Sequence, residues 1–162
     1  GKVMAAGKYT DKKKDSAWLS FNDRKEIMTK ENYLDGKLNG ENIAYYPSDP
    51  SKGKVKRYEI TNYEAGLKQG KWVQFYSTGK VKAEGVYKDG NFDGNVKWFF
   101  SSGKVEIEGY YKHAVKYGYW KYYENDGALK SKVYYRNGQV IKDDVLERHL
   151  ERLKKLKVEQ KN

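Results

Sequence analysis

A sequence repeat of about 24 residues runs through most of the chain and limits its fold more than any other feature. The repeat is clearest in Gly79-Lys80-Val81 and Gly103-Lys104-Val105, because Gly and Tyr follow both at the same distances. Six units align with these two segments, and they begin near residues 1, 25, 53, 79, 103 and 127. A chain with such internal similarity folds by stacking one small unit on the next.

Aromatic residues fill two columns of this alignment. A Tyr stands near the middle of every unit, and a second aromatic residue stands near the end of each full unit. The first column holds Tyr9, Tyr33, Tyr63, Tyr87, Tyr111 and Tyr135, and the second holds Phe21, Tyr45, Phe75, Phe99 and Tyr123. Because aromatic side chains bury large areas, we expect these residues to form the structural core of the repeats.

Each unit has the pattern of a β-hairpin. From Val81 to Lys88, apolar or small residues alternate with mostly charged ones, which is typical of a strand with one buried face. Asp89-Gly90 then favours a tight hairpin turn, since both residues tolerate positive φ. A single hairpin is marginal in water, so the units must stack. We therefore expect an all-β fold over residues 1–140, an elongated, twisted antiparallel array of stacked β-hairpin repeats.

The last part of the chain departs from the repeat. Leu146, Leu150, Leu153 and Leu156 recur at spacings of four, three and three residues, which places them on one face of a helix. We expect a C-terminal amphipathic α-helix over residues 141–162. It either caps the array or provides an interaction surface, and the residues alone leave both open.

Composition excludes several classes of protein. The chain has no Cys, which rules out disulfides, thiol nucleophiles and Cys-ligated metals. It has no apolar run of roughly 20 residues, so we expect a soluble protein. The start at Gly1 suggests that a signal peptide or another repeat precedes it. The compartment stays open between a bacterial envelope or secreted location and the cytoplasm.

The stretch from Gly70 to Lys80 follows the pattern G-x-W-x-x-Y-Y-x-x-G-K, with Phe in the place of the first Tyr. This pattern resembles the MORN-repeat family, and more closely the variant MORN repeats of bacterial YwqK-type antitoxin proteins. Asn42, Val96 and Ala114 depart from it. The resemblance implies a hairpin array that acts as a scaffold or binding surface, with protein partners and anionic lipid head groups as its ligands.

Catalysis needs a constellation of side chains, and none is visible. His113 and His149 have no second ligand at metal spacing. Glu84, Glu106 and Glu108 fall on the outward side of predicted strands near lysines, so we expect cross-strand charge pairs. The chain is therefore expected to be neither an enzyme nor a cofactor or small-molecule binder.

Aromatic residues that only some units carry point to a surface in the fourth to sixth units. They either fill the second face of a two-sided sheet or form an exposed binding patch. With residues from the repeat motif, they give a set of candidate binding residues. That set is Lys71, Trp72, Trp98, Phe100, Tyr110, Tyr117, Tyr119, Trp120, Tyr122 and Tyr134.

The charge of the chain indicates the kind of partner. Its formal net charge is +11, from 33 Lys and Arg against 22 Asp and Glu. We expect a protein partner that is acidic or carries an acidic patch, which includes an antitoxin-like role. Binding to anionic lipid or a membrane surface is the first alternative, and binding to single-stranded nucleic acid is the second.

Overall fold

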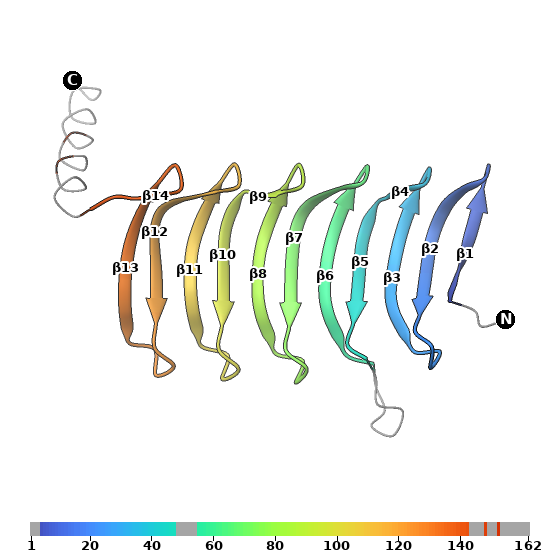
Figure 1. The fold of residues 1–162 in the computed structure, drawn as a ribbon, viewed down its shortest axis with the longest axis horizontal. Coiled ribbons are helices and arrows are strands. Elements are labelled where there is room, and N and C mark those ends of the chain that lie inside the picture. The colour runs from blue at the N-terminus through green and yellow to red at the C-terminus, as the bar shows by residue number, and fades with distance from the viewer. Residues whose placement is uncertain (1–3, 48–54, 143–147, 149–151, 153–162) are drawn as a thin grey trace.

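The computed structural model describes residues 4–47, 55–142, 148 and 152. These residues form one open antiparallel sheet of β-hairpins, which confirms the expected all-β class (Figure 1). The strands are β1 (Ala5–Thr10), β2 (Lys13–Phe21), β3 (Ile27–Leu34), β4 (Lys37–Leu38), β5 (Gly40–Tyr45), β6 (Arg57–Glu64), β7 (Leu67–Phe75), β8 (Val81–Lys88), β9 (Asn91–Phe92), β10 (Gly94–Phe99), β11 (Val105–Lys112), β12 (Val115–Tyr123), β13 (Leu129–Arg136) and β14 (Gln139–Val140).

Strand order in the sheet follows chain order. The main path runs from β1 to β14, while the short strands β4 and β9 pair back onto β3 and β8. Figure 1 shows the strands side by side in a single curved row, from the N-terminal end to the C-terminal end. The helix predicted over 141–162 lies outside the described residues except at 141, 142, 148 and 152, and so do the repeat starts at 1 and 53.

The hairpin turns join neighbouring units as well as neighbouring strands. Asp89 and Gly90 have φ of 50° and 83°, as a two-residue turn with two left-handed positions requires. The Gly90 N–H donates to the Lys68 carbonyl of the preceding unit at 2.9 Å. In the fifth unit Ala114 replaces the turn Gly, keeps a φ of 67° and donates likewise to the Phe92 carbonyl at 3.0 Å. One backbone hydrogen bond per turn thus fastens each unit to the one before.

One face of the sheet, here called the indole face, carries the most deeply buried side chains. Trp18, Trp72 and Trp120 are 8%, 7% and 2% exposed, and Val96 occupies the same column in the fourth unit at 1%. A Cβ atom on Gly109 would overlap the Trp120 ring, which therefore lies against the backbone of the neighbouring strand. Gly7 makes the same room for Trp18. A sheet without a second layer builds its core in this way, because a flat ring covers bare backbone.

Stacked and edge-on rings extend this core between units. Phe92 stacks on Tyr87 at 4.2 Å and on Tyr111 at 5.5 Å, and Tyr111 meets the Trp120 ring edge-on at 5.1 Å. The Lys116 ammonium covers Trp120 at 4.1 Å from the ring centroid, so a cation closes the outer side of the ring.

The predicted Tyr column lies along this face, with one exception. Tyr33, Tyr63, Tyr87, Tyr111 and Tyr135 are half-buried. Tyr9 is 60% exposed, although its ring touches Trp18 at 4.9 Å. The prediction that Tyr9 is a core residue is wrong, because β1 is an edge strand of the described sheet and has a neighbouring strand on one side only.

The second aromatic column lies on the other face. The pairing register shifts immediately before each member, for example between Gln74 and Phe75 and between Tyr122 and Tyr123. Alternation along β7 places Phe75 with Val73 and opposite to Trp72. The five residues are half-buried there: Phe21, Tyr45, Phe75, Phe99 and Tyr123. The two predicted aromatic columns therefore support opposite faces of one sheet.

The contact between Trp120 and Gly109 can be tested by filling its space. We expect Gly109→Ala to lower the free energy of unfolding by about 1–3 kcal/mol, since the new methyl group displaces a nearly buried indole. Gly85→Ala is the matched control, because its Cβ would meet a Val96 methyl at 2.9 Å and the Phe92 ring at 3.2 Å. The smaller Val96 side chain yields more easily. Urea unfolding followed by Trp fluorescence measures the free energy of unfolding of both variants. An equal loss of stability in the two would contradict a core in which the Trp120 ring lies against the backbone at Gly109.

Candidate binding surface

Four of the ten candidate binding residues lie on the indole face. Trp72 and Trp120 are nearly buried there, so both offer a partner almost no surface, contrary to the sequence-based expectation. Trp98 is half-buried with its ring 6.0 Å from that of Trp120. Burial and a hydrogen bond to Tyr135 raise the pKa of Tyr122 to about 12, which fits a half-buried phenol. These four residues lie on the same face as the most deeply buried rings.

Two further candidates lie apart from any aromatic cluster. Lys71 is exposed on β7, where it is paired with Val86 on β8. It shares a face with the remaining candidates but belongs to an earlier unit. Phe100 is half-buried just after β10, and its backbone N–H donates to the Lys104 carbonyl in the connecting turn.

The remaining four candidates come together on the face opposite the indole face. This tyrosine cluster consists of Tyr110, Tyr117, Tyr119 and Tyr134, from β11, β12 and β13. Tyr110 is paired directly with Tyr117, and the Tyr119 ring meets the Tyr134 ring edge-on at 5.0 Å. The first three are 39%, 37% and 37% exposed. The cluster is an accessible aromatic surface on the last two units.

Lysines cover part of the cluster. The Lys132 ammonium lies 3.7 Å from the centroid of the Tyr119 ring, and the Lys112 ammonium lies 5.4 Å from that of Tyr117. Both distances are within the range of cation–π attraction. The rings and the positive charges therefore form one surface.

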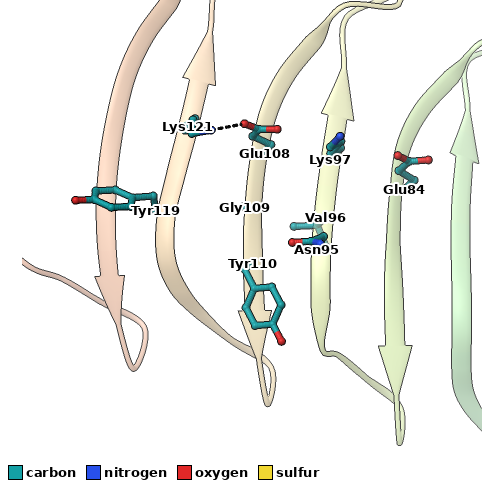
Figure 2. A pocket seen from close by; sticks show the side chains of 9 residues that line it. All are labelled: Glu84, Asn95, Val96, Lys97, Glu108, Gly109, Tyr110, Tyr119 and Lys121. Atoms are coloured by element: carbon teal, nitrogen blue, oxygen red, sulfur yellow. Dashed lines mark hydrogen bonds and ion pairs between the residues drawn. The ribbon is translucent and has the colours of Figure 1, made fainter. Parts of the chain in front are cut away.

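A row of alternating charges, here called the charge ladder, runs across the sheet beside the tyrosine cluster. It consists of Glu84, Lys97, Glu108 and Lys121, each paired with the next on adjacent strands (Figure 2). The Lys121 ammonium is 2.8 Å from a Glu108 carboxylate oxygen. This contact confirms cross-strand charge pairing for Glu108, although its partner comes from the second strand of the hairpin.

The four ladder residues, with Tyr110 and Tyr119 of the cluster, line one open depression of about 500 Å³. Among its lining residues, Asn95, Tyr110 and Tyr119 lie closer to the hairpin turns, and the ladder residues lie in a row farther from them (Figure 2). The sequence-based set of candidates missed Lys97 and Lys121. Their position depends on the pairing register of four strands, and the charges along any one strand do not reveal it.

The hydrogen bond between Lys121 and Glu108 favours the ionised form of both residues. The hydrogen bond from Lys121 lowers the pKa of Glu108 below its ordinary value, and one from the Tyr123 hydroxyl at 2.8 Å acts in the same direction. Glu108 in turn raises the pKa of Lys121. Burial, with Tyr117 and Tyr119 nearby, raises the pKa of Tyr134. The surface thus combines the Glu108–Lys121 ion pair with tyrosine side chains.

In the described part of the chain, no three Asp, Glu or His side chains gather as metal ligands would. The described residues also contain no helix that is long and apolar enough to cross a membrane.

The pairing of Glu108 makes stability depend on pH. Its lowered pKa means that the ionised carboxylate stabilises the fold above its ordinary value of 4.5, and this contribution is lost as pH falls through the lowered pKa. We expect Glu108→Gln to be less stable than the parent at pH 7, and the difference to narrow below pH 4.5. Thermal unfolding across this range measures the difference, with exposed Glu64→Gln as the control for net charge. A difference that does not change with pH would contradict the ion pair.

A family model described as MORN repeat variant matches residues 68–89, 92–113 and 116–137. The matched segments start 24 residues apart, and each runs from the end of one hairpin turn into the next. Together they contain the whole tyrosine cluster and charge ladder. No curated protein matches the chain. These three segments of the chain are therefore similar to variant MORN repeats.

Proposed function

We propose that this chain is a non-catalytic scaffold that binds a protein partner through the tyrosine cluster and the adjoining lysines. The observation that carries the proposal is the exposure of clustered tyrosines on the face opposite the buried tryptophans. An antitoxin that acts by binding its partner protein would be one instance of this function.

Tyrosine suits such a surface for physical reasons. Its ring offers a large apolar area, its hydroxyl forms hydrogen bonds, and few of its torsions are lost on binding. Aromatic residues are enriched at protein interfaces and among the residues that dominate binding energy. With about 37–39% of their area exposed, Tyr110, Tyr117 and Tyr119 have surface left to bury.

Charge indicates which partner fits. The net charge of +11 attracts an acidic partner from a distance, which increases the rate of encounter more than the final affinity. Near the cluster, Lys97, Lys112 and Lys121 can meet carboxylates on the partner at short range. Glu84 and Glu108 lie among them and fix the orientation of binding, because they repel a partner placed in the wrong register.

The same geometry favours a protein over the two alternatives. Single-stranded nucleic acid binds by stacking bases on free ring faces, but the Lys132 ammonium covers the Tyr119 ring. An anionic membrane would meet the carboxylates of Glu84 and Glu108 as well as the lysines. The first feature disfavours binding of nucleic acid and the second disfavours binding of a membrane, whereas neither opposes binding of a protein.

Removing the exposed rings tests the proposal. We expect Tyr110→Ser with Tyr119→Ser to abolish retention of a discrete protein from lysate of the source cell. The bait is the full chain, the lysate is nuclease-treated, and the washes use about 0.15 M and then about 0.5 M salt. Attraction by charge alone collapses across this range. Tyr58→Ser is the matched control, since Tyr58 is 38% exposed but lies on β6.

Two results would contradict the proposal. One is retention of the same protein by the double variant, with circular dichroism showing that the variant is folded. The other is a bait that retains only lipid or nucleic acid, both released by the higher salt, because net charge would then be the active feature.

A further inference from the structure

Lys132 breaks the alternation of the charge ladder. It is paired directly with Lys121 on β12, so two lysines face each other across adjacent strands. Like charges in this position destabilise a sheet. Glu84 and Glu108 occupy the equivalent position in the fourth and fifth units, each beside a lysine of the next or preceding strand. A third Glu at position 132 would have continued the ladder.

The charge of Lys132 is not balanced by a nearby acid. Within the described part of the chain no carboxylate forms an ion pair with Lys132, whereas Lys121 is already bonded to Glu108 at 2.8 Å. The Lys132 ammonium instead lies over the Tyr119 ring. The residue is exposed, so its cation remains open to solvent on the side away from the ring.

Aromatic and basic groups surround this cation. Tyr119 and Tyr134 meet edge-on beside it, and β13 places Lys132, Tyr134 and Arg136 along one face because alternate residues of a strand share a face. The Lys130 ammonium is bonded to Glu124 at 3.1 Å, which leaves Lys132 as the less compensated of the two lysines. Lysines on an edge strand also discourage unwanted strand pairing, but that role does not require flanking tyrosines.

We propose that Lys132, with Lys121 and the Tyr119 and Tyr134 rings, holds a carboxylate side chain of an acidic peptide segment in the partner. The inference rests on the proposed function and names the anchor point within that surface. A carboxylate there bridges the two facing lysines, removes their repulsion and receives charge-assisted hydrogen bonds. The two facing lysines repel each other in the free protein, and both attract the bound carboxylate in the complex.

A defined acidic probe tests this directly. N-acetyl-hexaglutamate is added to the ¹⁵N-labelled full chain, and amide chemical shifts are followed, with N-acetyl-hexaglutamine as the neutral control. We expect the largest shifts at the amides of Lys121, Lys132, Tyr119 and Tyr134. Lys132→Gln should weaken the affinity about tenfold, as loss of a charge-assisted contact does.

Lys30→Gln is the matched control. Lys30 is exposed at the equivalent position of the second unit, where it is paired with Leu19, and we expect it to leave the affinity unchanged. Lys132→Glu supplies a second readout. It should raise the thermal midpoint of unfolding, because Glu at this position continues the alternation of charges, and it should also weaken the affinity for hexaglutamate.

Three results would overturn the inference. The first is a set of shifts spread over the lysines of all units and equally large in Lys132→Gln. The second is that inorganic phosphate causes larger chemical-shift changes at these amides than hexaglutamate does at equal concentration, which would make the site a phosphate site. The third is a lower thermal midpoint for Lys132→Glu. None of these results bears on the pull-down with the tyrosine double variant. The carboxylate site at Lys132 can therefore fail while the proposed function stands.

Discussion

The contact of an aromatic ring with bare backbone is the interaction on which this structure depends. Within the described residues no helix or second sheet covers this single layer, so its own side chains must cover it. The Trp120 ring does this by lying against Gly109, and Trp18 lies against Gly7 in the same way. Without a side chain at these glycines, a strand accepts a ring from its neighbour.

This way of building a core makes the two faces of the sheet unequal. The rings and the lysines that cover them fill the indole face, from Trp18 to Tyr135. The other face is held by buried Ile43 and Val73 in the earlier units, by charge pairs such as Lys121 with Glu108, and by a column of aromatics at the connecting turns. It can therefore carry exposed tyrosines without exposing the core. Substitutions on this face can change binding while the repeats continue to stack.

Much of the fold follows from the sequence because it depends on local pattern. The alternation in Val81–Lys88 and the Asp89-Gly90 turn predict a hairpin, and the repeat predicts that hairpins stack. The four clustered tyrosines were among the candidates because they are absent from the common motif. The face of each aromatic residue was harder to predict. Alternation along β7 places Trp72 and Phe75 on opposite faces, but it does not say that the Trp72 ring is buried. The lysines of the ladder were missed because their neighbours come from other strands.

The central claim is that one face is packed while the tyrosine cluster on the other is open. Hydroxyl-radical footprinting of the free protein, read residue by residue by mass spectrometry, tests it most directly. The structure predicts that Trp72 and Trp120, at 7% and 2% exposure, stay largely unmodified while Tyr110, Tyr117 and Tyr119 are oxidised. Oxidation of the two tryptophans as fast as the three tyrosines would show that the rings do not lie on the backbone, and would contradict the account.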